Sequence, residues 1–264
     1  MSQTLSFLYF EVTFKGELMN ISLLILVVIA ILLGALVRNI FGFGEALVTM
    51  PLLSLLNIDF KLSVSIVAII GILVAFPVFI KSRKDIDWSI IKRLLIGSII
   101  GAPIGIFIVK WTDEAVIVKC LGIFILVYGL VNLINQFVKV YQMNKKIPNQ
   151  FDYIAGTIAG LLGSAYNSHG VPIVIYGTLK KWDIFDLKKI SQVHFFITGC
   201  FIVTSHGVSG FWSPSLWYLL IIVIPLLVLT LLFGNMISKR IDPKSFIKYV
   251  YILLIVFGIL MIFK

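Results

Sequence analysis

The sequence has very little charge for its length. Of its 264 residues, 13% are Asp, Glu, Lys or Arg, whereas 60% are hydrophobic and the mean hydropathy is +1.08. Soluble domains are about 45–50% apolar, so this composition excludes a soluble globular protein and indicates an integral membrane protein. Apolar runs occupy nearly the whole chain and leave no stretch for an appended soluble domain. We therefore expect a single membrane domain over residues 1–264.

Cysteines and the common motifs of catalysis are also scarce. The two cysteines, Cys120 and Cys200, lie in separate apolar runs, where a thiol packs as a small hydrophobic group. The sequence contains no G-x-x-x-x-G-K-[ST] loop for ATP, no H-E-x-x-H and no G-x-S-x-G. We expect no enzyme, no cofactor, no metal site and no catalytic residue. An intramembrane enzyme that uses Ser168, His169 or His194 is the less favoured alternative.

Negative charge is scarcer than positive charge. Lys and Arg number 22 against 12 Asp and Glu, which gives a formal net charge of +10. In a membrane protein such an excess sets the topology and contacts anionic lipid headgroups, so we expect lipid as a partner and no nucleic acid. Residues 1–18 lack the basic start and cleavage site of a signal peptide, and we expect them to lie at the membrane interface. The expected location is the cell membrane, with several spans.

Long apolar runs alternate with two interrupted ones. Each long run is near the ~20 residues that a transmembrane helix needs. The first interrupted run is broken by Arg38–Pro51 and the second by Gly163–Gly170, and neither part of the second is long enough to span. The predicted spans are 62–80, 90–109, 115–138, 187–205, 216–237 and 246–263, and the interrupted segments are 21–37 with a continuation to 56, and 153–162 with 171–179.

The order of these runs repeats along the chain. Aligning Pro51 with Pro172 superimposes the two interrupted segments. We predict an all-α membrane protein built from two repeats, about residues 20–140 and 150–264. Each repeat would consist of a broken or re-entrant helical segment followed by three transmembrane helices.

Loop charges predict how the repeats are oriented, because cytoplasmic loops are enriched in Lys and Arg. The uncharged loop 209–215 is predicted to lie outside. If the second and third basic clusters are both cytoplasmic, the segment between them is a re-entrant hairpin and the repeats are inverted, as in many transporters. A broken helix that crosses the membrane fully is the alternative, and the sequence leaves both open. The basic clusters are Lys81, Arg83, Lys84, Lys92 and Arg93; Lys139, Lys145 and Lys146; Lys180, Lys181, Lys188 and Lys189; and Lys239, Arg240, Lys244 and Lys248.

Arg38 is the strongest single signal of function. A charge deep in a bilayer costs at least ~2.5–3.5 kcal/mol on insertion scales, so an ionisable residue there is a candidate site residue. A guanidinium offers a planar fork of donors suited to carboxylate, sulfonate or phosphate oxygens. The alternatives are a permanent ion pair with Glu45 or extension of the side chain to the membrane surface.

Glu45 and His169 are the candidates for carrying a coupling proton. Glu45 follows the first break, so it either caps free N–H groups at a helix N-terminus or, as a buried carboxylate, takes up a proton. His169 lies in the second break, and histidine is the usual proton switch near neutral pH. The alternative for His169 is a structural hydrogen bond to a nearby carbonyl.

The remaining candidates flank the two breaks. Gln192 and His194 are two residues apart and lie on different faces of a helix, so we expect at most one to face the site directly. We expect His206, at a helix end, to contact water, and the small-residue stripe Gly97–Gly105 to serve close helix packing. The predicted substrate-binding residues are Arg38, Asn39, Gly42, Gly44, Glu45, Asn167, Ser168, His169, Gly170, Gln192 and His194.

At both breaks the sequence resembles the TauE/SafE family of anion permeases. The first-half pattern of that family, G-x-G-G-G followed by three residues and V-P, corresponds to Gly42–Pro51. The second-half pattern, close to F-N-T-G-G-P-P-x-V-I-Y, corresponds to Tyr166–Tyr176. A W-D and an R-A-T-L-Q that follow in one branch correspond to Trp182-Asp183 and Lys188–Gln192. The resemblance runs from about residue 20 to the end.

The resemblance implies a secondary transporter for a small organic or sulfur-containing anion such as sulfite, a sulfonate or a carboxylate. Alternating access, with or without a coupled proton, is the expected mechanism, and the positive ends of the half-helices would point at the anion. An anion channel is the alternative. Glu45, Ala46 and His169 replace glycines of the family pattern, so a larger or differently charged substrate is also compatible. The sequence leaves the oligomeric state open, a homodimer included.

Overall fold

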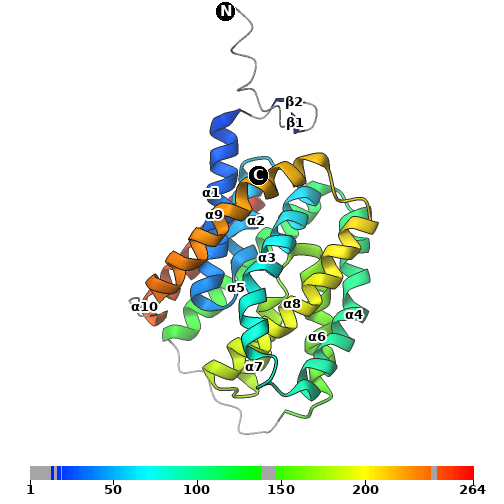
Figure 1. Ribbon diagram of the computed structural model, residues 1–264, viewed down its shortest axis with the longest axis vertical. Coiled ribbons are helices and arrows are strands. Elements are labelled where there is room, and N and C mark those ends of the chain that lie inside the picture. Colours follow the sequence, from blue (N-terminus) through cyan, green and yellow to red (C-terminus); the bar gives the residue numbers. More distant parts are fainter. Residues whose placement is uncertain (1–12, 15–16, 19, 138–146, 239–242) are drawn as a thin grey trace, which may run out of the picture.

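The computed structural model describes residues 13–14, 17–18, 20–137, 147–238 and 243–264, and nearly all of them are helical. This confirms the all-α prediction for the bundle itself. A two-residue ladder, β1 (Thr13–Phe14) with β2 (Glu17–Leu18), precedes it. The helices are α1 (Ile21–Phe41), α2 (Glu45–Leu55), α3 (Phe60–Ser82), α4 (Trp88–Trp111), α5 (Glu114–Phe137), α6 (Phe151–Tyr166), α7 (Gly170–Leu179), α8 (Ile184–Val208), α9 (Pro214–Ser238) and α10 (Pro243–Ile262) (Figure 1).

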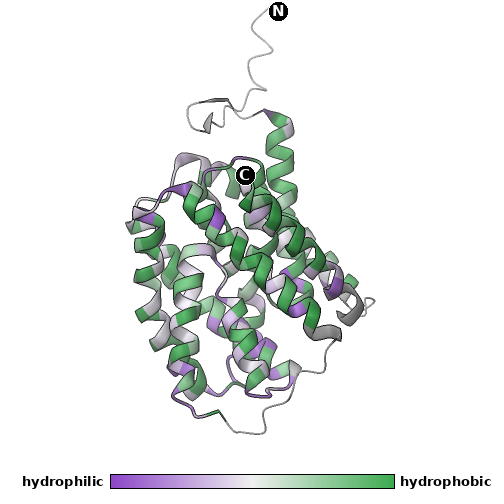
Figure 2. Cartoon of the chain, turned by 180° about the vertical axis from the view of Figure 1, so that it is seen from behind, coloured by the Kyte–Doolittle hydropathy of each residue, from purple (hydrophilic) through white to green (hydrophobic). Residues whose placement is uncertain are grey.

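Five of the described helices, α1, α3, α4, α5 and α9, are long and apolar enough to cross a membrane. Large hydrophobic side chains such as Phe107 and Ile221 are exposed on these helices. Figure 2 shows that hydrophobic residues make up most of the length of the helices in the bundle. An apolar surface of this kind is stable only against lipid, so the protein is an integral membrane protein. α2 and α7, with 11 and 10 residues, are too short to span a hydrocarbon layer of ~30 Å.

The first break is shorter than the sequence predicted. It covers only Gly42–Gly44, and Pro51 lies inside α2. Gly42 and Gly44 have φ values of +84° and +94°, a left-handed backbone that glycine adopts without steric cost. These two residues end α1 and begin α2, so the chain reverses within three residues.

α1 and α2 fold back against each other. The Thr49 hydroxyl of α2 donates to the Ala30 carbonyl of α1 at 3.5 Å. A Cβ atom on Gly34 would lie 2.8 Å from the Glu45 carbonyl oxygen, so the close approach of the two helices needs glycine there. The first interrupted segment is therefore a hairpin whose tip is the Gly42–Gly44 break.

α6 and α7 form a second hairpin. Its tip is Asn167–His169, and its two far ends meet where the Lys180 Nζ atom donates to the Asn149 Oδ1 atom at 2.9 Å. Figure 1 shows α6 and α7 reaching the end of the bundle opposite to the chain's N-terminus. The chain enters and leaves this hairpin at the same end. Lys139, Lys145, Lys146, Lys239 and Arg240, which the orientation argument also used, lie outside the described residues.

Small residues allow the closest helix contact of the fold, between α4 and α6. A Cβ atom on Gly97 would lie 2.1 Å from the Tyr153 carbonyl oxygen, and one on Gly101 would lie 2.0 Å from the Thr157 carbonyl oxygen. The Ser164 hydroxyl donates to the Ala102 carbonyl at 2.7 Å further along. The prediction that the Gly97–Gly105 stripe serves packing is confirmed, and α4 and α6 form one tightly packed pair.

Candidate functional site

The tips of the two hairpins meet in the interior of the bundle. A Cβ atom on Gly170, at the start of α7, would lie 3.2 Å from the Cβ atom of Phe43 in the first break. Both tips line one cavity, together with Phe195 of α8. The starts of α2 and α7, where a helix has N–H groups without intrahelical partners, both line this cavity. In α7 the Val171 N–H donates to the Ser168 carbonyl at 3.2 Å and Pro172 has no N–H, so Gly170 is the α7 residue whose N–H faces the break. Residues more than 120 positions apart in the sequence thus share one polar site.

Arg38 and Glu45 form an ion pair inside this site. The Arg38 Nη1 atom lies 2.9 Å from the Glu45 Oε2 atom, and the two side chains are 6% and 4% exposed. Arg38 stands in the last turn of α1 and Glu45 in the first turn of α2, where the helix dipole favours a negative charge. The pairing that the sequence left open is therefore present, and each charge has its partner across the break.

Gln192 of α8 contacts both the first break and Arg38. Its Nε2 atom donates to the Gly42 carbonyl oxygen, and its Oε1 atom accepts from the Arg38 Nη2 atom at 3.5 Å. The guanidinium carbon of Arg38 also lies 5.2 Å from the centre of the Phe195 ring, within the range of a cation–π contact. Arg38 is thus held by a carboxylate, an amide and an aromatic face.

The second break contributes a histidine and an amide. The ring of His169 meets Phe195 edge-to-face with a centroid distance of 4.5 Å. Asn167 has a left-handed backbone with φ of +53°, and its Nδ2 atom donates to the Val64 carbonyl of α3. The Ser168 hydroxyl donates to the Tyr166 carbonyl at 3.3 Å. Phe195 therefore connects Arg38, in the last turn of α1 before the first break, to His169 of the second break.

Several buried polar atoms around the cavity have no hydrogen-bond partner in the protein. Among the described residues they include Arg38 Nε, Glu45 Oε1, Asn167 Oδ1 and His169 Nδ1. Buried polar groups normally have a protein or water partner, so four such atoms at one cavity indicate a place for a ligand or for water. The described residues include no cluster of three side chains that would hold a metal ion.

The cavity is small in this conformation. Its volume is about 20 Å³, slightly more than the ~10–15 Å³ that one water molecule needs. An organic anion, which has several heavy atoms, does not fit without movement of the surrounding helices. The described conformation is therefore closed around the polar groups.

Four of the predicted site residues do not line this cavity. Gly42 and Gln192 lie directly behind it and support Arg38, as described above. The Asn39 Nδ2 atom instead donates to the Leu231 carbonyl of α9 at 2.9 Å. The Nε2 atom of His194 lies 2.8 Å from the Ser98 hydroxyl of α4, on the other face of α8 from Gln192. The cavity itself is lined by the predicted residues Arg38, Gly44, Glu45, Asn167, Ser168, His169 and Gly170.

The prediction for His206 was wrong. It is 0% exposed, and its Nε2 atom lies 2.9 Å from the Ser164 carbonyl oxygen. The chain after α8 folds over the ring, and Phe211 lies against it at a centroid distance of 5.2 Å. This contact with a neighbouring connection, which position in the helix does not reveal, removes the ring from solvent.

Two residues important to the site escaped sequence reasoning. Gly71 of α3 faces the ion pair, where a Cβ atom would lie 2.7 Å from Arg38 Nη1 and 3.3 Å from Glu45 Oε2. Phe195 is 2% exposed and contacts both breaks. In the sequence each of these residues stands in an apolar run and looks like an ordinary core residue of a helix. Their contacts with Arg38 form only when the helices pack together.

Comparison with known protein families gives a match over most of the chain. A family described as Sulfite exporter TauE/SafE matches residues 26–261, which is nearly the whole chain. No curated protein and no solved structure matches. The match includes the second hairpin, the first hairpin from residue 26 of α1 onward, and every residue that lines the cavity.

Proposed function

Because the chain belongs to the sulfite exporter TauE/SafE family, we propose that it is a secondary transporter of a small organic or sulfur-containing anion. Sulfite, a sulfonate or a carboxylate is the expected kind of substrate, and the cell membrane is the expected location. The family consists of membrane transporters of sulfur anions, which agrees with the apolar surface of the helices.

One observation carries this proposal: the starts of α2 and α7 converge with Arg38 on a single closed cavity. A helix start presents free N–H groups and the positive end of the helix dipole, and is a recurrent anion site in proteins. Two such starts and a guanidinium favour an anion at the cavity. We assign substrate contact to Arg38, Asn167, Ser168 and the N–H groups of Gly170 and of the residues that begin α2.

The pattern of helix contacts supports two repeats, in which α1–α5 correspond in order to α6–α10, and the entry of the two hairpins from opposite ends of the bundle favours an inverted relation between them. Exchanging the halves turns the α1–α9 contact into the α6–α4 contact and the α3–α9 contact into the α8–α4 contact, and all four contacts are present. The same exchange of halves leaves the α3–α8 and α5–α10 contacts unchanged, as a two-fold relation between the halves requires. A pseudo-two-fold axis between the halves, with the substrate at their interface, is a common transporter design.

Inverted hairpins give a testable topology. With Cys120 and Cys200 replaced by Ser, cysteines introduced at Gln150 and Asp186, which flank the α6–α7 hairpin, should react with an impermeant thiol reagent from the same side of the membrane. A cysteine at Ser213, in the α8–α9 connection, should react from the other side. Reaction at Gln150 and Asp186 from opposite sides would replace the hairpin with a fully crossing broken helix.

The paired state of Arg38 supports proton coupling. An incoming anion competes with the Glu45 carboxylate for the guanidinium, and two negative charges beside one buried positive charge are unfavourable. A proton on Glu45 removes this competition. We therefore assign the coupling proton to Glu45, with His169 as the second candidate because its ring lines the same cavity.

Counterflow in proteoliposomes tests the transport function. A thermal-shift screen of sulfite, sulfonates and carboxylates first selects the anion, because a ligand at 100 times its Kd stabilises by ~2.7 kcal/mol. Proteoliposomes loaded with the unlabelled anion should then transiently accumulate a labelled trace above its equilibrium level, and protein-free liposomes should not. A channel gives only downhill equilibration, and an enzyme gives a converted product without counterflow. Either result would contradict the proposal.

A further inference from the structure

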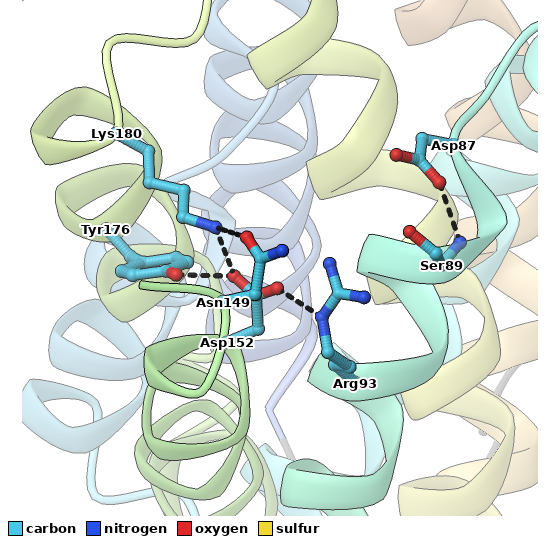
Figure 3. Close-up of polar contacts among 7 residues, drawn as sticks. All are labelled: Asp87, Ser89, Arg93, Asn149, Asp152, Tyr176 and Lys180. Atoms are coloured by element: carbon cyan, nitrogen blue, oxygen red, sulfur yellow. Dashed lines mark hydrogen bonds and ion pairs between the residues drawn. The ribbon is translucent and has the colours of Figure 1, made fainter. Parts of the chain in front are cut away.

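A second polar cluster lies at the open end of the α6–α7 hairpin, away from the cavity. Its centre is Asp152 in the first turn of α6, which is 0% exposed. A carboxylate buried this completely is stable only with charged or hydrogen-bonding partners. Figure 3 shows the partners around it: Arg93 on one side, and Tyr176 and Lys180 on the other.

The two oxygens of Asp152 serve different parts of the fold. The Oδ2 atom accepts from the Arg93 Nε atom of α4 at 2.5 Å. The Oδ1 atom accepts from the Tyr176 hydroxyl of α7 and from the Lys180 Nζ atom, just after α7, at 2.9 Å. Because α4 and α6 pack tightly through their glycines, the Arg93 contact lies within one rigid pair. The Oδ1 contacts tie the end of α7 to that pair.

α7 is the short helix with the weaker packing. Its counterpart α2 packs against α1, α3, α5 and α10, whereas α7 packs mainly against α6 and α8. The start of α7 lines the cavity, and its end carries Tyr176 and Lys180. A displacement at the Asp152 end of a rigid ten-residue helix therefore reaches the cavity at its other end.

We propose that Asp152 is a latch for α7, fixed by Arg93 and holding Tyr176 and Lys180, and that its release opens the cavity toward the Lys180 end of the bundle. This inference rests on the proposed transport function, because a carrier must open its site to each side in turn. In the described conformation the latch is closed and so is the cavity. Release needs water or a new partner for the Asp152 carboxylate, so the latch favours the closed state strongly.

Accessibility of the cavity tests the latch without any substrate. In a background with Cys120→Ser and Cys200→Ser, Ser168→Cys places one thiol at the cavity. An impermeant maleimide applied at the Lys180 side of oriented vesicles should label this thiol about tenfold faster in Asp152→Asn. That factor corresponds to ~1.4 kcal/mol, near the lower end for one hydrogen bond to a charged group.

Two further variants complete the test. Tyr176→Phe removes one donor to Oδ1 and keeps the ring in place, so it should still fold and should raise the labelling rate severalfold. Asp87→Asn is the matched control, because Asp87 caps α4 at the same end of the bundle, where its Oδ1 atom accepts from the Ser89 N–H at 2.8 Å and makes no contact with α7 in Figure 3. The Ser89 hydrogen bonds hold the pKa of Asp87 below its usual value, so this control loses the same charge. Asn caps a helix as well as Asp, and labelling should stay at the background rate.

Three results decide the outcome. Unchanged labelling in folded Tyr176→Phe overturns the latch, whether or not Asp152→Asn folds. Equal acceleration from both sides of the membrane also overturns it, because that result means general loosening of the bundle. Counterflow separates the two proposals. Normal counterflow in the wild type, with unchanged labelling in the latch variants, contradicts only the latch. Accelerated labelling in the latch variants, with no counterflow in the wild type, contradicts only the transport function.

Discussion

Arg38→Lys is expected to weaken anion binding by about 10- to 100-fold, although the positive charge is kept. The guanidinium contacts Glu45 through Nη1 and Gln192 through Nη2 while lying over Phe195. An ammonium is a point charge without this planar fork and cannot make the same set of contacts with an anion added. Loss of one hydrogen bond to a charged partner costs ~1.5–3 kcal/mol, which gives the expected factor. Titration calorimetry with the purified protein measures it.

Arg83→Lys is the matched control for this variant. Arg83 directly follows α3, and its side chain is exposed and does not line the cavity. The control should bind the anion as the wild type does. Wild-type affinity in a well-folded Arg38→Lys protein would restrict Arg38 to a structural ion pair with Glu45 and would leave the helix starts as the anion site.

Gly71→Ala tests the position of the Arg38 guanidinium from α3, the helix that faces the ion pair. The added methyl group would lie 2.7 Å from Arg38 Nη1, so the guanidinium must move. Alanine is a better helix former than glycine by ~1 kcal/mol, so lost helix propensity does not explain a weaker affinity. If both changes act through the Arg38 position, the double variant should bind little worse than Arg38→Lys alone, because coupled sites are not additive.

The sequence predicts the helices far better than it predicts their contacts. Hydropathy places six helices, α3, α4, α5, α8, α9 and α10, within about three residues of the predicted spans, because a bilayer fixes the length of an apolar helix near ~20 residues. Of these six, α3, α4, α5 and α9 are long and apolar enough to cross a membrane, whereas α8 and α10, predicted as spans 187–205 and 246–263, are not among the described helices that meet this measure. The two breaks are visible for the same reason: glycine and polar residues interrupt apolar runs. The first break was predicted to extend to Pro51 because a proline usually marks a helix end, but α2 continues through this residue.

Residues whose meaning depends on distant partners could not be predicted in the same way. Asp152 is an ordinary acidic residue at a helix start until α4 and α7 bring Arg93, Tyr176 and Lys180 to it. Asn39 follows Arg38 directly, yet the turn of the helix points its amide at Leu231 of α9. No local pattern encodes these contacts between helices. The candidate site could be predicted because its polar groups stand in or next to the two breaks.

Proton coupling predicts that anion affinity rises as the pH falls. A proton on Glu45 frees Arg38 for the anion, so binding of the anion takes up a proton. Over the pH range in which the Glu45 carboxyl is unprotonated in the free protein and protonated in the anion complex, the affinity should change about tenfold per pH unit. It should level off below this range, where both states carry the proton. Calorimetry over a series of pH values, with the anion's own ionisation accounted for, gives the profile.

Glu45→Gln and His169→Gln identify the group that carries this proton. Glutamine at position 45 mimics the protonated carboxyl, so that variant should bind with high affinity at every pH. Glutamine at position 169 mimics the neutral ring, and it should flatten the profile at low affinity if His169 is the carrier. Glu114→Gln, in the exposed first turn of α5, is the matched control and should keep the wild-type profile. If both single variants and the double variant also keep that profile, neither residue carries the proton, and the anion site stands on Arg38 and the two helix starts alone.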